Sequence, residues 1–314
     1  ATPNAEEQYT LKLTFVNYEG DQTENAKSTL SAKVMIQKEK IVQTVANICK
    51  NGQSLSSCIA AMDGIDETLY HHDGTIKSDS GFFVEYYDSN TGKDVRKTYP
   101  AGTVLDANDN SYRYAGASSE VNNYVCFGTN TTPCPADNLY RIIGVFDNKV
   151  GENQTEQRVK LIKSDYATST LLGTDGDYKD KYTTVASANN WDNSTYKGNN
   201  LTNIAAYNWN KSKQNTWSLS NLNKTNLNTN FITKIGADWA AKIAETTWKV
   251  GGNTFVNIGN RLAKTAYQNE INNPVTTNSQ DNATEYSAKI GLMYVSDYMY
   301  AASPSAWTTQ LGYY

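Results

Sequence analysis

Four cysteines in two local pairs constrain this chain more than any other feature. They are Cys49, Cys58, Cys126 and Cys134, and each pair encloses a short loop. Such an even, closely spaced set predicts disulfide bonds, and of the three connectivities that four cysteines allow, the local one is favoured. Structural zinc sites usually have shorter spacings and a histidine nearby, so disulfides are favoured over zinc. Because cytosolic thiols are kept reduced, we expect an extracellular protein.

The charge balance and the hydropathy exclude two classes of partner. The chain has 28 basic and 32 acidic residues, so it lacks the basic surface that binding to nucleic acid requires. No window approaches the roughly 18 consecutive apolar residues of a membrane-spanning helix, and we expect none. With only 2 histidines, the chain also has few side chains suited to acid–base catalysis.

Residues 8–18 alternate between apolar and polar side chains, which is typical of a half-buried strand. The apolar positions are Tyr9, Leu11, Leu13 and Phe15. Such a strand can pair inside its own domain, or it can add to the open sheet edge of a neighbouring subunit. The second alternative makes this segment a candidate assembly strand and predicts self-association.

The first 118 residues predict an α+β domain. Apolar residues recur at helical spacing across residues 28–50, which predicts an amphipathic helix. Residues 81–87 and 95–99 flank a loop that contains Gly92, which predicts a β-hairpin. Hydrophobic periodicity is lost across residues 106–118, so we place a domain boundary near residue 118.

Residues 119–314 predict a second α+β domain that is aromatic, loop-rich and irregular. Strands are expected at residues 139–146 and 159–162. All 6 tryptophans lie in this part. Because tryptophan more often fills an interior, we expect Trp239 and Trp248 to be buried. Trp191, Trp209 and Trp217 remain candidates for contact with a ligand such as a sugar ring.

Four segments of the second part carry a resemblance to known proteins. They read NNYVCFG at 122–128, CPADNLYRIIGVF at 134–146, VKLIK at 159–163 and AKIGLMYVSDY at 288–298. In this order they resemble extracellular surface proteins of Bacillota (Firmicutes), including pilin-like proteins. They are also similar to bacterial domains with a C-type-lectin-like or formylglycine-generating-enzyme-like fold. The resemblance spans most of residues 66–311 and implies a secreted protein whose second domain is lectin-like.

Neither histidine predicts a catalytic or metal centre. His71 and His72 are adjacent, so in a strand their side chains point to different sides and bind one metal only awkwardly. A serine hydrolase of the usual kind would need a Gly-x-Ser-x-Gly elbow, which the sequence lacks. The reactive cysteines of formylglycine-generating enzymes have no counterpart at a matching place. We therefore expect no catalysis.

Two acidic loops are incomplete candidates for calcium binding. One has Asp106, Asn108 and Asn110, and the other has Asp175 and Asp177. Both lack the central glycine and the terminal glutamate of an EF-hand loop. Asx turns explain such loops without an ion, so we otherwise expect no cofactor.

The sequence thus predicts a non-enzymatic protein of the bacterial cell surface. It would be a subunit of a pilus-like filament, or an adhesin that contacts a glycan or a host surface. The alternative is a carbohydrate-binding module or a glycan-active enzyme on a lectin-like fold. Such an enzyme would need two carboxylates in a cleft, whereas a binding module would need exposed aromatic rings.

Overall fold

The computed structural model describes residues 43–44, 53–88, 91–173, 216–253, 258–274 and 284–313. By its internal contacts the chain divides into Ala1–Glu39 and Lys40–Tyr314, and every described residue belongs to the second unit. The candidate assembly strand at residues 8–18 lies outside the described residues. Within the described ranges, no helix has the length and apolar character needed to cross a membrane.

The helix predicted at residues 28–50 is described only at Gln43–Thr44, and there the prediction is wrong. These two residues form strand β1, which pairs in parallel with β6 (Tyr124–Cys126). The surrounding sequence, Ile41-Val42-Gln43-Thr44-Val45, is rich in β-branched residues, which favour strands. Pairing with β6 therefore outweighs the helical spacing of the apolar residues.

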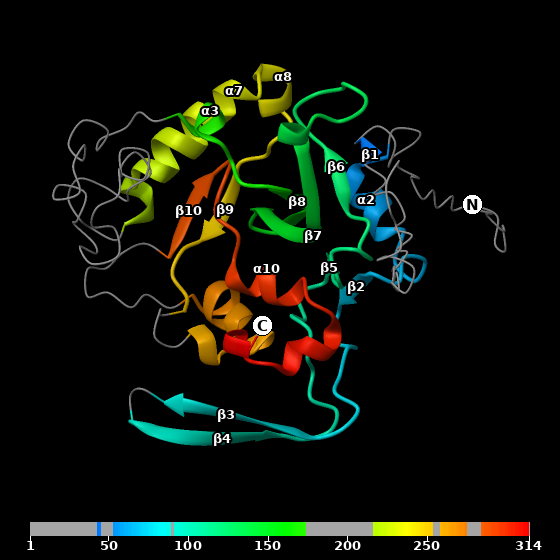
Figure 1. The fold of residues 1–314 in the computed structure, drawn as a ribbon, viewed down its shortest axis with the longest axis vertical. Coiled ribbons are helices and arrows are strands. Elements are labelled where there is room, and N and C mark those ends of the chain that lie inside the picture. Colours follow the sequence, from blue (N-terminus) through cyan, green and yellow to red (C-terminus); the bar gives the residue numbers. More distant parts are fainter. Residues whose placement is uncertain are drawn as a thin grey trace, which may run out of the picture. The chain divides into compact units, whose positions relative to one another are not determined.

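A six-stranded sheet forms the centre of the described unit (Figure 1). Five of its strands follow the order β1-β6-β7-β5-β2. The sixth strand, β8, is not part of this order and pairs with β7. The remaining strands of this sheet are β2 (Leu69–His72), β5 (Ser111–Tyr114), β7 (Leu139–Gly151) and β8 (Gln154–Lys163). Strands from both sides of residue 118 share the sheet, which therefore continues across the position of the expected domain boundary.

The strands predicted at residues 139–146 and 159–162 are confirmed as parts of β7 and β8, which pair antiparallel. The register between them shifts between Ile142 and Gly144. A Cβ atom on Gly144 would lie 2.2 Å from the backbone oxygen of Tyr112 in β5. Glycine at this position therefore allows β5 and β7 to approach closely.

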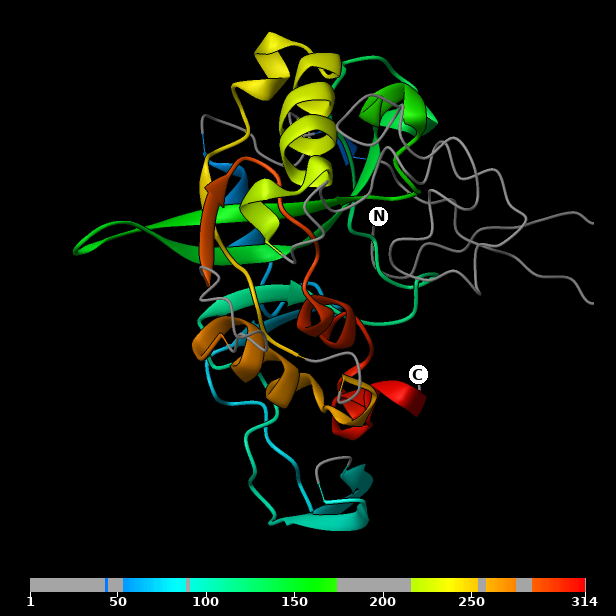
Figure 2. The ribbon, with the colours of Figure 1, turned by 90° about the vertical axis from the view of Figure 1, so that its left-hand side faces the viewer.

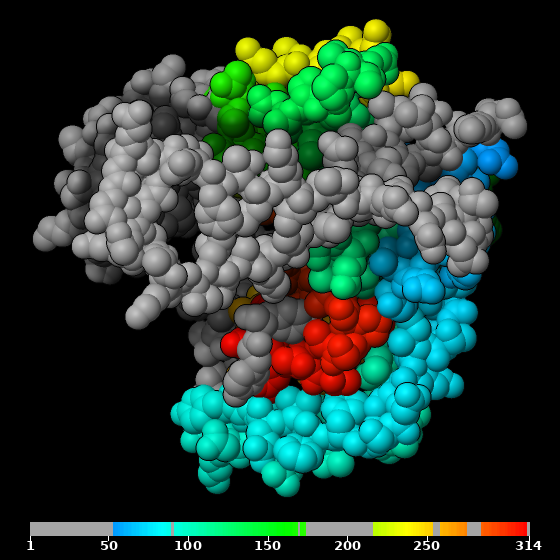
Figure 3. Space-filling view, turned by 45° about the vertical axis from the view of Figure 1, so that its right-hand side comes forward, coloured from blue at the N-terminus to red at the C-terminus, as the bar shows by residue number. Residues whose placement is uncertain are grey.

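The predicted hairpin is confirmed as β3 (Phe82–Asp88) and β4 (Lys93–Tyr99). Gly92 has φ +66°, a left-handed conformation that glycine adopts readily, and its N–H donates to Asp88 O at 2.7 Å. The two strands form a sheet of their own. They lie at one end of the described unit, below the C-terminal helices in the views of Figures 1, 2 and 3.

Short helices and a second two-stranded sheet complete the described unit, so its class is α+β, as predicted. The second small sheet pairs β9 (Thr246–Lys249) with β10 (Glu285–Ala288). The α-helices are α2 (Leu55–Ala60), α3 (Ser169–Leu172), α7 (Ile232–Lys234), α8 (Ala237–Ala240), α9 (Ala263–Tyr267) and α10 (Val295–Tyr300). The 3₁₀ helices are η2 (Ala136–Asn138), η3 (Trp217–Leu219), η5 (Ile258–Asn260), η7 (Pro304–Thr308) and η8 (Leu311–Tyr313), and the π-helices are η4 (Leu222–Phe231) and η6 (Gln268–Asn272).

Asparagine side chains form part of the protein interior, so a sequence rich in polar residues can still fold. Asn223 and Asn226 of η4 are fully buried. The side-chain amide of Asn223 donates to Trp217 O (3.2 Å), and that of Asn226 donates to Leu172 O (2.9 Å). Because these amides satisfy backbone carbonyls, they join irregular segments where a regular ladder is missing.

Two apolar clusters pack around this framework. One lies between the central sheet and its neighbouring helices and includes Ile59, Ile142, Val145 and Phe231. The other joins the C-terminal helices and includes Ala263, Ala266, Tyr267, Met299, Tyr300 and Trp307.

Candidate functional site

A buried arginine lies at the centre of the described interior. The side chain of Arg113, in β5, is 3% exposed, and its guanidinium donates to Asp109 Oδ2 (2.8 Å) and to Asp297 Oδ1 (3.1 Å). The Phe146 ring centre lies 4.6 Å from the guanidinium carbon. Burial lowers the pKa of Arg113, but the two carboxylates outweigh burial and the pKa lies above its usual value. The side chain is therefore a permanent buried cation.

Asp297 also pairs with a second cation, Lys160, whose side chain is 14% exposed. Lys160 of β8 donates to its other carboxylate oxygen. The Lys160 Nζ atom lies 4.1 Å from the ring centre of Tyr294 and 5.2 Å from that of Trp248. Burial lowers the pKa of Lys160, and the charge of Asp297 only partly opposes this effect. One carboxylate of α10 thus joins the two strands β5 and β8.

Carboxylates also hold the start of α10. The N–H of Tyr294 donates to Asp297 Oδ2 (3.2 Å), and Glu270 of η6 accepts from the N–H groups of Val295 (3.0 Å) and Ser296 (2.9 Å). Negative charge at a helix N-terminus is favourable. Since each charged group of this network has a partner inside the protein, the network acts as a structural cross-link.

The two histidines lie on strand β2, where their side chains point to opposite sides. His72 is fully buried, and its Nδ1 accepts from the N–H of Ala107 at 3.0 Å, which places the ring proton on Nε2. Burial lowers its pKa to about 3, so the ring is neutral. His71 stacks on Tyr112 with 4.2 Å between ring centres, and its Nε2 lies 2.9 Å from Asn110 Oδ1.

A hollow of about 350 Å³ opens beside His71. Its lining includes Asp63, Asp66, Glu67 and Asp73. The His71 Nδ1 atom lies 3.8 Å from Asp63 and 3.7 Å from Asp73. In the described ranges, no set of three His, Cys, Asp or Glu side chains is grouped closely enough to hold a metal ion.

The first calcium candidate is engaged by the protein itself. Asp106 is fully buried, and its carboxylate accepts backbone N–H groups from Gly74 (3.0 Å), Ile76 (3.2 Å) and Asn108 (2.9 Å). Asn108 and Asn110 are in the left-handed conformation, with φ 53° and 58°. The loop is therefore built as an Asx turn around Asp106. The second candidate, with Asp175 and Asp177, lies outside the described residues.

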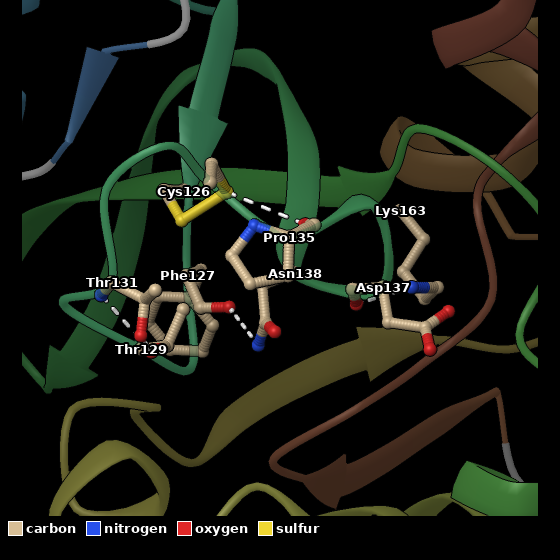
Figure 4. The surroundings of a disulfide bond; sticks show 9 residues. Cys126, Phe127, Thr129, Thr131, Pro135, Asp137, Asn138 and Lys163 are labelled. Carbon is tan, nitrogen blue, oxygen red and sulfur yellow. Dashed lines mark hydrogen bonds between the residues drawn. A yellow bond between two sulfur atoms is a disulfide. The ribbon is translucent and has the colours of Figure 1, made fainter.

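The disulfide between Cys126 and Cys134 is confirmed (Figure 4). It closes an exposed loop at the end of β6, and two hydrogen bonds between Phe127 and Asn138 hold the base of that loop. Lys163, at the end of β8, donates to Asp137 O at 2.7 Å. The loop is thus fixed to the central sheet on both sides.

A second disulfide includes Cys58. This residue of α2 is also disulfide-bonded. Its predicted partner, Cys49, lies outside the described residues, so that pairing stays a prediction.

The tryptophans correct two expectations. Trp217, a candidate ligand contact, is 7% exposed and therefore cannot offer its ring face to a sugar. Trp239 and Trp248 are half-buried rather than buried. Trp239 packs edge-to-face on Phe127, and Trp248 donates to Ala288 O. Trp191 and Trp209 lie outside the described residues.

Sequence reasoning missed the buried network of Arg113, Lys160 and Asp297. Arg113 and Asp297 are 184 residues apart, and Lys160 and Asp297 are 137 residues apart. No local spacing could connect them. Comparison with protein-family models, curated proteins and solved structures found no match. The resemblance to bacterial surface proteins therefore stays a prediction.

Proposed function

We propose that this chain is an extracellular surface protein of a bacterium and acts as a subunit of a pilus-like filament or as an adhesin. The observation that carries the proposal is the disulfide bonding of Cys58, Cys126 and Cys134. Disulfides persist in oxidising compartments and are rare in the cytosol. The proposal includes a lectin-like fold for the part that the sequence resemblance spans, most of residues 66–311, so that β2 and β5 belong to it.

Binding rather than catalysis is supported by the way the charged interior is used. Burial changes the pKa values of Arg113 and Lys160, but both cations pair with Asp297 deep in the protein. Perturbed pKa values mark a functional site when they line a cleft. Here they accompany a cross-link between strands and a helix.

The test is light scattering combined with negative-stain microscopy on the oxidised protein, with and without residues 1–18. A filament subunit assembled through its first strand should form large particles that disappear on truncation, while the truncated chain stays folded by circular dichroism. Monomers in both forms would exclude the filament. Particles that survive truncation would exclude residues 8–18 as the connector.

A second candidate function, glycan binding, is favoured by one face of the β3–β4 hairpin. Phe83 is 54% exposed and Tyr87 is 55% exposed. Because they are four residues apart on one strand, they lie on the same face. Between them Glu85 pairs with Arg96 of β4 at 2.7 Å. The Arg96 guanidinium covers one face of the Phe83 ring, 4.1 Å from its centre, which leaves the other face of Phe83 and the ring of Tyr87 for contact with a sugar chain.

Affinity electrophoresis through gels that contain neutral polysaccharides tests this candidate. The double substitution Phe83→Ala and Tyr87→Ala should abolish any retardation of the native protein. Tyr166→Ala, which removes an aromatic ring that is 77% exposed but outside the hairpin, should leave it unchanged. Equal retardation of all three proteins, or of none, would exclude this face as a glycan site.

A further inference from the structure

Within the part of the chain that the structure describes, no strand pairs with the outer edge of β4. Among the described residues, β3 and β4 form a two-stranded sheet, and β4 lies on the side of β3 that faces away from the rest of the unit (Figure 1). The outer edge of β3 is contacted instead, because Asn260 of η5 donates to Tyr87 O at 2.9 Å. Of the two edges, that of β4 is therefore the accessible one.

The pairing register identifies the backbone groups on this edge. Tyr87 lies opposite Asp94, and the carbonyl of Tyr87 points away from β4 toward Asn260. In an antiparallel pair, such a residue and its opposite partner both direct their N–H and C=O groups outward, and the pattern repeats every second residue. Asp94, Arg96 and Thr98 therefore direct backbone groups outward, and the described backbone outside the hairpin makes no hydrogen bond to them.

Charge restricts which strand can add to this edge. β4 contains Lys93, Arg96 and Lys97 with a single acidic residue, Asp94. Lysines on an edge strand oppose unspecific pairing. An edge that repels most strands becomes selective when its partner has the opposite charge.

The candidate assembly strand has this opposite charge. Residues 8–18 alternate as an added strand should, and acidic residues flank them on both sides, namely Glu6, Glu7, Glu19 and Asp21. Lys12 is the only basic residue across residues 6–21. The segment belongs to Ala1–Glu39, whereas β4 belongs to Lys40–Tyr314.

We propose that the outer edge of β4 accepts residues 8–18 of a second copy of this chain. The proposal rests on the proposed filament function and names its acceptor site. Backbone hydrogen bonds to Asp94, Arg96 and Thr98 supply affinity, and the flanking carboxylates select the lysine-bearing edge. Because each copy has one donor segment and one acceptor edge at different places, the contact is head-to-tail and forms an open chain or a ring.

Charge reversal in the full-length protein tests the contact, with sedimentation velocity over a range of concentrations. The acceptor variant is Lys93→Glu with Lys97→Glu, and the donor variant is Glu6→Lys with Glu7→Lys. Each should weaken association about tenfold or more, and the combination of both should restore it. The matched control, Lys224→Glu with Lys234→Glu, reverses two exposed lysines on η4 and α7 and should change nothing.

Hydrogen exchange gives a second reading that does not depend on the variants. Association should slow exchange at the amides of Asp94, Arg96 and Thr98 in the native protein. Oligomers that require residues 1–18 but tolerate the acceptor variant would overturn the acceptor site and leave the filament function standing. A native protein that is monomeric at every concentration would overturn both.

Discussion

His72 makes the stability of this protein depend on pH. Burial, the largest cause, lowers its pKa in the folded state to about 3, whereas an unfolded histidine has a pKa of about 6.5. Between these pH values the His72 ring binds a proton in the unfolded chain but stays neutral in the folded protein. The free energy of unfolding therefore falls as the pH drops from about 6.5 toward 3. At pH 4.5 this single group should cost about 3 kcal/mol relative to pH 7.

Urea titrations at pH 7 and pH 4.5 measure this loss. His72→Asn is the control, because asparagine can still accept the N–H of Ala107 but does not titrate. The native protein should lose about 3 kcal/mol more than the variant between the two pH values. Equal losses would show that His72 is not responsible.

Asp297 should contribute more to the free energy of unfolding than its position in a short helix suggests. Asp297→Asn removes the charge that both Arg113 and Lys160 face, and an unpaired buried cation typically destabilises by about 3–5 kcal/mol. Glu85 and Arg96 form an exposed ion pair, in which each side chain is 59% exposed. Glu85→Gln breaks this pair and should change the free energy of unfolding by less than about 1 kcal/mol. Urea denaturation at pH 7 compares them, and similar effects of both substitutions would contradict a structural role for the buried network.

At the level of elements, the close approach of β5 to β7 depends on Gly144. Gly144→Ala would place a Cβ atom 2.2 Å from Tyr112 O and 3.1 Å from the Cα atom of Arg113, so β5 must move. We expect a loss of about 2–3 kcal/mol in the free energy of unfolding. Gly259→Ala meets no atom within 4 Å and should cost less than about 0.5 kcal/mol. If thermal denaturation gives the same shift for both, the sheet is more adaptable than this geometry allows.

The elements that sequence predicts well are those whose signal is local. Residues 81–87 and 139–146 are short runs rich in aromatic and aliphatic residues, and both contribute to strands, β3 and β7. Residues 43–44 were expected to be helical, because the spacing of apolar residues could not reveal the pairing with β6, about 80 positions later. The same limit hides the buried network, since nothing near Arg113 in the sequence indicates that a carboxylate 184 residues away will neutralise it.

At the scale of the whole molecule, the central sheet joins strands from both sides of residue 118, although the two parts of the sequence differ in composition. β2 and β5 come before residue 118, whereas β6, β7 and β8 come after it. The cross-link between Arg113 and Asp297 spans the same position. Residues 106–118, where the loss of periodicity predicted a linker, instead contain β5 of the shared sheet, and the described unit should fold as one cooperative body.

This continuity predicts that residues 119–314 do not fold alone. Without β5, the side of β7 at Val145 loses its partner strand, and Asp297 loses its ion pair with Arg113. The fragment should show no near-ultraviolet circular dichroism and no cooperative urea transition. Mixing it with residues 1–118 under oxidising conditions should restore both, because the sheet and the charged network can form only from the two pieces together. A fragment that unfolds cooperatively by itself, at the urea midpoint of the full chain, would instead establish an independent domain and reduce the sheet contacts across residue 118 to a docking surface.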